Sequence, residues 1–170
     1  IDQDTTNHLL TLAEQYDFVI ASDECYSEIY LDEANPPRGL LQYANELGNT
    51  DYRRCLVFHS LSKRSNVPGL RSGFVAGDAT LIKEFFRYRT YHVCSMQLHT
   101  QNASIVAWSD EDHVFENRQK YKQKFEQVCK ILSAVIDVEA PPASFYLWPA
   151  LPGSDTDFAR DIYTRENIKV

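Results

Sequence analysis

The sequence predicts an α/β fold with a largely parallel sheet. Residues 18–21, 56–59 and 73–77 are short apolar runs, which is typical of strands that are covered on both faces. Helical patterns lie between and after these runs, and such alternation indicates parallel strands connected by helices. The 170 residues, of which 44% are hydrophobic, suffice for one domain, or for one domain and part of a second.

Helices are predicted before the first strand, between the first and second strands, and after the third strand. Residues 4–16 begin with N-cap candidates, and their apolar side chains recur at helical spacing. Residues 31–54 contain two prolines and two glycines, and they indicate a loop around a short helix at residues 40–47. After the third strand, Asp78 is placed to cap a helix that runs from residue 79 to about residue 91.

The second half of the chain predicts three more helices and two strands. A helix is expected around residues 97–109, and an apolar stripe between residues 115 and 135 predicts a long one. Prolines then interrupt the pattern. Residues 144–148 have the composition of a strand, residues 158–163 that of a helix, and residues 167–170 resemble the beginning of a strand.

The charge pattern excludes two classes of partner. The chain has 17 basic and 24 acidic residues and a formal net charge of −7, whereas binders of nucleic acid or anionic lipid gather Lys and Arg on one face. The apolar runs are also far too short to cross a membrane. The four cysteines of the chain are isolated from one another, which favours a reducing compartment and predicts a cytoplasmic protein. The histidines have no partners at metal-ligand spacing, so no metal site is expected.

Polar side chains follow two of the predicted strands. Asp23 and Tyr26 come after the first strand, with Cys25 between them as a small packing residue. The second strand is followed by a larger set: Ser60, Ser62, Lys63 and Arg71. Ligands of open α/β sheets bind at the carboxyl ends of strands. Neighbouring strands lie about 4.8 Å apart, so we expect roughly 5–10 Å between Asp23 and Lys63, a span that one aromatic ring bridges.

These side chains match the functional groups of pyridoxal 5′-phosphate. A lysine amine such as Lys63 forms a Schiff base with an aldehyde. The Asp23 carboxylate pairs with a protonated pyridine nitrogen, and Tyr26 donates a hydrogen bond to a ring phenolate. Two hydroxyls and a forked cation suit the phosphate dianion: Ser60, Ser62 and Arg71.

The spacing of these residues resembles a known cofactor signature. D-E-x-Y, followed about forty residues later by S-x-S-K and then by an arginine eight residues on, is similar to fold-type-I, class I/II aminotransferases. The stretches 60–78, 23–30 and 143–148 resemble more specifically the bacterial N-succinyldiaminopimelate aminotransferases. The resemblance implies a catalytic Lys63 that is both the Schiff-base lysine and the acid/base. It also implies the cofactor contacts: Asp23, Tyr26, Ser60, Ser62, Lys63 and Arg71.

The resemblance further implies an architecture and a reaction. Residues 1–109 would be the C-terminal part of a three-layer α/β/α large domain that binds pyridoxal 5′-phosphate. Residues 110–135 would form the connecting helix, and residues 136–170 would begin a smaller α+β domain. We expect a fragment of a homodimeric enzyme that exchanges an amino group between glutamate/2-oxoglutarate and N-succinyl-diaminopimelate in lysine biosynthesis. Its substrate-carboxylate arginine and its upstream cofactor contacts are expected outside the chain.

Two alternatives stay open. Another fold-type-I enzyme, such as an aspartate- or aromatic-type aminotransferase or a carbon–sulfur β-lyase, would share these cofactor contacts. A non-catalytic binding or dimerisation module would retain the fold alone. Taken singly, each residue also has an ordinary interpretation, since Lys63 alone is a solvated lysine and Asp23 alone is a capping residue. The combination favours the enzyme.

Overall fold

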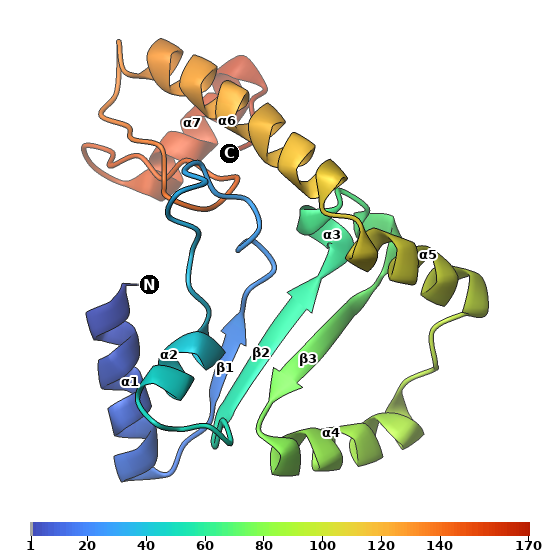
Figure 1. Cartoon of the computed structure of the whole chain (residues 1–170). Helices are drawn as coiled ribbons and strands as arrows, with labels where there is room; N and C mark the ends of the chain where they lie inside the picture. Colours follow the sequence, from blue (N-terminus) through green and yellow to red (C-terminus); the bar gives the residue numbers. More distant parts are fainter. Residues whose placement is uncertain (1) are drawn as a thin grey trace. The chain divides into compact units, whose positions relative to one another are not determined.

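The computed structural model describes residues 2–170, which divide into two compact units (Figure 1). The first unit contains the residues up to Lys122 together with Pro142–Phe145. The second contains Gln123–Pro141 and Tyr146–Val170. The division falls within the long helix α6 (Asp112–Leu132), which was predicted from its apolar stripe.

A three-stranded sheet forms the centre of the first unit. Its strands are β1 (Ile20–Asp23), β2 (Cys55–Ser60) and β3 (Gly73–Gly77), and their order is β1-β2-β3. β1 and β2 run parallel, and Asp23 is the register partner of Phe58. The predicted strands are therefore confirmed, although the first is shifted by two residues toward the C-terminus.

The prediction of a largely parallel sheet is wrong for β3, which runs antiparallel to β2. Only residues 61–72 connect the two strands, and they form the short helix α3 (Leu61–Arg64) and the 3₁₀ turn η1 (Pro68–Leu70). A parallel neighbour requires a crossover that returns the chain to the far end of the sheet, usually by a longer helix. The chain instead turns back at the end where β2 finishes.

Helices α1 (Gln3–Tyr16) and α2 (Leu40–Glu46) pack together beside β1 and β2 (Figure 1). Their apolar side chains form the core with two residues of β2. The buried cluster consists of Leu10, Leu40, Tyr43, Ala44, Cys55 and Val57. Burial of this cluster fixes the position of β2. It therefore also fixes the C-terminal end of β2, after which the polar residues come.

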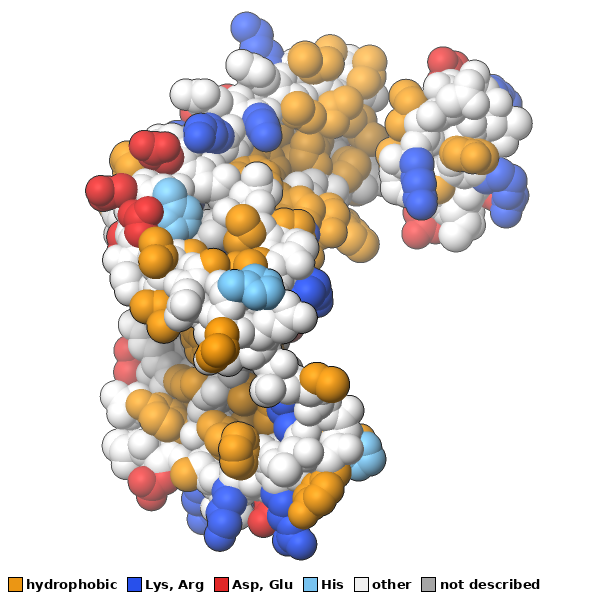
Figure 2. All heavy atoms as spheres, turned by 90° about the vertical axis from the view of Figure 1, so that its right-hand side faces the viewer, with side chains coloured by type: hydrophobic (Ala, Val, Ile, Leu, Met, Phe, Trp, Pro, Cys, Tyr) orange, Lys and Arg blue, Asp and Glu red, His pale blue; other side chains and the backbone are white. Residues whose placement is uncertain are grey.

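Helices α4 (Ala79–His92) and α5 (Leu98–Ser109) follow β3. The Asp78 carboxylate caps α4 as predicted, because it accepts hydrogen bonds from the backbone N–H groups of Thr80 and Leu81 at 2.8 and 3.2 Å. Figure 2, which faces these helices, shows hydrophobic side chains at the surface. The exposed set includes Phe86, Tyr88, Tyr91, Leu98, Ile105 and Val106.

The strand predicted at residues 144–148 does not form. An isolated antiparallel bridge joins Ala143 to Tyr30, and two flanking hydrogen bonds run from Leu31 N to Pro142 O and from Ser144 N to Ile29 O. A strand needs a continuous partner, but the segment that faces it is a loop of turns.

The second unit contains one complete helix, α7 (Asp155–Glu166), which is longer than the predicted segment 158–163 because Ser154 caps it at Asp157 N. Residues 167–170 form no strand, contrary to prediction, since no strand within residues 2–170 pairs with them. Within residues 2–170, no helix combines the length and the apolar character that a membrane crossing requires.

The contact between β3 and β2 leads to a stability prediction at Gly77. Its φ is +135°, and an added Cβ would lie 2.0 Å from the carbonyl oxygen of Cys55. We expect Gly77→Ala in the full-length protein to lower the free energy of unfolding by more than about 2 kcal/mol in urea titrations, because strain and a backbone clash combine. Gly69→Ala is the control, since nothing lies within 4 Å of the new methyl group there. An equal loss of unfolding free energy in both variants would contradict the close contact between Gly77 and Cys55.

Candidate functional site

The parallel pairing of β1 with β2 brings the predicted residues to one edge of the sheet. Asp23 ends β1 and Ser60 ends β2, and Glu24 N donates to Phe58 O at 2.9 Å just beyond the register pair. A cavity of about 440 Å³ opens at this edge. All six predicted site residues line it: Asp23, Tyr26, Ser60, Ser62, Lys63 and Arg71. Residues from two distant parts of the chain therefore share one hollow.

Lys63 reaches the cavity from α3, the single turn that follows β2. Ser60 caps this turn by accepting a hydrogen bond from Ser62 N at 3.4 Å. Leu61 is fully buried and Arg64 is 2% exposed, whereas Lys63 is half-buried. The two buried side chains anchor the turn, so that the intervening pair borders the cavity. The Lys63 Nζ lies 4.6 Å from the centroid of the Phe145 ring.

Asp23 supplies a carboxylate from the end of the neighbouring strand, β1, at the same edge of the sheet. Its Oδ1 accepts a hydrogen bond from Cys25 N at 3.1 Å. The pKa of the carboxyl is below its ordinary value of 3.8, chiefly because the Cys25 side chain hydrogen-bonds to it, with smaller contributions from the Cys25 N–H and from His59. A carboxylate that stays ionised near neutrality is suited to pair with a cationic ring nitrogen.

Cys25 also borders the cavity, although the sequence predicted only a small packing residue at this position. It lines the cavity, and the Ser60 hydroxyl donates to its sulfur at 3.3 Å. Burial, reinforced by the Asp23 charge, raises the pKa of the thiol, so the thiol is a weak nucleophile at neutral pH. Its position within D-E-C-Y was the available signal, because it lies between two predicted site residues.

Two aromatic rings pack together beside the site. The Tyr26 and Phe145 rings lie 5.0 Å apart at an interplanar angle of 51°. Phe145 belongs to a segment that resembles the aminotransferases, but no role was predicted for it. The Lys63 amine also lies over this ring, so Phe145 contacts both the Tyr26 ring and the lysine.

Arg71 lines the cavity together with Pro68 of η1. Arg71 adopts a left-handed backbone, with φ of +55°, and its Nη1 donates to Pro68 O at 2.9 Å. This bond holds the guanidinium beside the turn. Two residues later, an added Cβ on Gly73 would lie 2.5 Å from His59 O. The glycine therefore lets β3 approach β2 and keeps Arg71 near Ser60.

The residues present fit pyridoxal 5′-phosphate by their chemistry. The cavity has the volume of small-ligand sites, and it combines an amine, a carboxylate and a phenol with two hydroxyls and a guanidinium. No metal alternative arises within residues 2–170, where no group of three His, Cys, Asp or Glu side chains is arranged to hold an ion.

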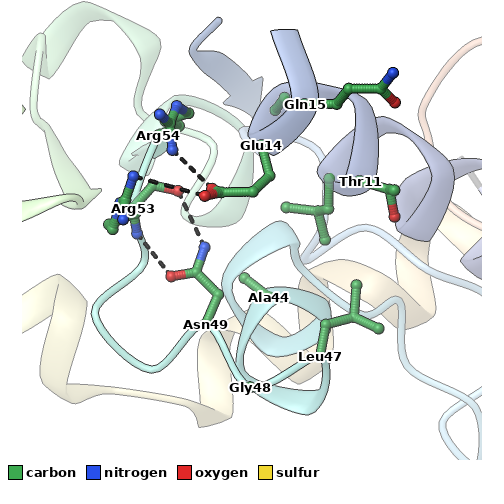
Figure 3. A pocket seen from close by; sticks show the side chains of 11 residues that line it. Thr11, Glu14, Gln15, Ala44, Leu47, Gly48, Asn49, Arg53 and Arg54 are labelled. Carbon is green, nitrogen blue, oxygen red and sulfur yellow. Dashed lines mark hydrogen bonds and ion pairs between the residues drawn. The ribbon is translucent and has the colours of Figure 1, made fainter. Parts of the chain in front are cut away.

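A larger cavity, of about 670 Å³, lies away from these residues, between α1, α2 and the segment before β2 (Figure 3). Its charges are paired with one another. Arg54 Nη1 lies 2.7 Å from Glu14 Oε2, and Arg53 Nη2 lies 3.6 Å from Glu14 Oε1. It contains none of the predicted site residues, so we assign the chemistry to the smaller cavity.

Comparisons with known proteins agree with the resemblance. A family model described as "Aminotransferase class I and II" matches residues 1–170. The curated LL-diaminopimelate aminotransferase of Nitratidesulfovibrio vulgaris strain Hildenborough is 35% identical over 159 residues, which are 92% of this chain and 39% of that protein. The chain thus spans about two fifths of the length of this curated relative.

Solved structures confirm the expected partial α/β fold. An aminotransferase from Neisseria meningitidis Z2491 has a TM-score of 0.91 and 54% identity, covering 99% of this chain and 43% of that one. The aminotransferase AspB from Helicobacter pylori 26695 has a TM-score of 0.86 and 37% identity, covering 99% of this chain and 44% of that one.

The Asp23 carboxyl leads to a prediction about pH. Its folded pKa is lower than its unfolded pKa, so its ionisation stabilises the fold above pH 3.8, and this contribution is lost as pH falls through the folded pKa. Cys25→Ala should raise the folded pKa toward 3.8, because the largest cause of its depression is the Cys25 side chain. Titration of the Asp23 carboxyl carbon by NMR measures it. Cys25→Ser, which keeps a donor, is the control. An unchanged pKa in Cys25→Ala would disprove the assignment.

Proposed function

The chain belongs to the class I and II aminotransferases, and on that premise we propose that the full-length protein is a pyridoxal-phosphate-dependent transaminase acting on an amino acid and a 2-oxo acid. One observation carries the proposal: the six residues that the signature selects line a single cavity.

Five of the residues that line the cavity would hold the cofactor. Asp23 would bind the pyridine nitrogen, and Tyr26 the ring hydroxyl. At the other end, the phosphate would accept hydrogen bonds from three side chains: Ser60, Ser62 and Arg71. The low pKa of Asp23 supports its role, because an ionised carboxylate favours the protonated ring.

Lys63 would perform the proton transfer. When bound, pyridoxal 5′-phosphate supplies an aldehyde that joins an amine and a ring that accepts the electron pair released at the neighbouring carbon. Lys63 Nζ would take the proton from the α-carbon of the substrate and return it on the cofactor side. The Phe145 ring, whose centroid lies 4.6 Å from Nζ, would limit water there and so would slow exchange of the proton with solvent.

We propose N-succinyl-diaminopimelate as the amino substrate, with glutamate and 2-oxoglutarate as the other pair. The sequence stretches that resemble N-succinyldiaminopimelate aminotransferases support this choice. A relative named LL-diaminopimelate aminotransferase, which is 35% identical, supports the diaminopimelate skeleton. We further propose that the protein is a homodimer and that it acts in the cytoplasm.

The role of Lys63 predicts a specific covalent label. The full-length protein, incubated with pyridoxal 5′-phosphate and reduced with borohydride, should carry the cofactor mass on Lys63, as read by peptide mapping. Lys63→Ala should lose the label and transamination, because proton shuttling of this kind contributes on the order of 10²–10⁴-fold in rate and the amine is also the attachment point. Lys83→Ala, on α4, is the control. A folded dimer with no label on Lys63 would support a non-catalytic module instead.

The substrate proposal predicts a donor profile. With 2-oxoglutarate as acceptor, the full-length protein should form glutamate faster from N-succinyl-diaminopimelate than from LL-diaminopimelate, aspartate or an aromatic amino acid, measured as kcat/KM. A preference for unmodified LL-diaminopimelate or for aspartate would overturn the choice of substrate and leave transamination intact. Release of pyruvate and ammonia from cystathionine as the main activity would assign the protein to the β-lyases.

A further inference from the structure

Helix α3, which carries Lys63, is too short to be stable alone. It has four residues, and an isolated helical turn fixes several backbone dihedrals for a single hydrogen bond. Its position must therefore come from contacts with the rest of the first unit. Leu61 is one such contact, because it is fully buried.

Arg64, next to Lys63, is the second anchor. Its guanidinium donates to Ala107 O, near the C-terminal end of α5, at 2.8 Å and also bonds to Glu111. The same group lies 5.1 Å from the Trp108 ring centroid. A planar guanidinium can bind a carbonyl and a carboxylate at its edge while an aromatic ring lies near it. These contacts therefore fix the direction of α3 as well as its distance from α5.

Asn117 on α6 holds the backbone of the same turn. Its side-chain amide donates to Lys63 O at 3.2 Å and to Arg64 O at 3.4 Å. The last carbonyls of a helix have no partner within the helix, so an outside donor directly fixes them. Asn117 therefore acts on the Lys63 main chain without contacting its amine.

The same network extends to the loop that carries Tyr26. Glu28 Oε1 lies 3.6 Å from Arg64 Nε, and Glu28 Oε2 lies 3.8 Å from Arg118 Nη1. Arg118 follows Asn117 on α6. One carboxylate thus joins the two segments that approach the cavity from β1 and from β2.

Resting on the proposed function, we infer that Arg64 and Asn117 are positioning residues for Lys63. They fix α3 against α5 and α6, and they thereby hold the Lys63 amine at the cavity where Asp23 and Tyr26 also lie. Neither side chain lines that cavity. Their effect is on the placement of the amine, because misplacement of a reacting group by about 1 Å can cost on the order of 10²-fold in rate.

The test uses Asn117→Asp in the full-length protein, a change of almost identical shape that removes the amide donors. We expect borohydride trapping of pyridoxal 5′-phosphate on Lys63 to slow about 10- to 100-fold in timed mapping experiments. In the loaded enzyme, kcat should fall by a similar factor while KM changes by less than about twofold. Asn117→Gln, which keeps the amide, should recover part of the trapping rate. Asn102→Asp makes the same chemical change at an exposed site on α5 and should trap at the wild-type rate.

The outcomes separate the two proposals. Absence of a label on Lys63 in the wild type would reject the proposed function. A labelled wild type together with wild-type trapping by folded Asn117→Asp would reject only the positioning role. If Asn117→Asp does not fold, Asn117→Ser, a neutral side chain too short to reach both carbonyls, gives the same test. Arg64→Lys, which keeps the charge and loses the fork, should slow trapping in the same direction, and an unchanged rate would count against Arg64.

Discussion

The parallel pairing of β1 with β2 is the constraint on which the site depends. Parallel strands finish at the same edge of a sheet, so a carboxylate that ends β1 and the polar turn that follows β2 arrive at one place although about forty residues separate them. Burial of the helix α1 and α2 side chains against β2 fixes this pairing. An antiparallel arrangement of the same two strands would put Asp23 and Lys63 at opposite ends of the sheet.

The second requirement is that the turn after β2 be rigid. A four-residue helix does not hold a side chain in place by itself, and here two buried neighbours and an amide from α6 do so. The division of labour within the turn follows from burial: Leu61 and Arg64 point into the protein, and Ser62 and Lys63 border the cavity. The side chains proposed to react are thereby separate from the side chains proposed to position them, so each set can be tested by its own substitutions.

The three strands and the residues that line the cavity could be predicted from the sequence. The features that could not be predicted were missed for physical reasons. The six residues predicted for the site, which line one cavity, could be selected because their side-chain chemistry is distinctive and because they come after the apolar runs of two strands. The direction of β3 was missed because apolar runs indicate strands without indicating direction. The strand at residues 144–148 was wrongly predicted because composition does not reveal whether a partner strand exists. The contact made by Asn117 could not be predicted from the sequence, since its amide donates to two carbonyls more than fifty residues earlier in the chain.

The central claim is that Asp23 and Lys63 converge on one ring. The most direct measurement is a crystal structure of the full-length protein grown with pyridoxal 5′-phosphate. We predict a carboxylate oxygen of Asp23 within hydrogen-bonding distance of the ring nitrogen, and Lys63 Nζ bonded to the carbon that carried the aldehyde oxygen. A cofactor bound elsewhere, or one that contacts only one of these two side chains, would contradict the claim.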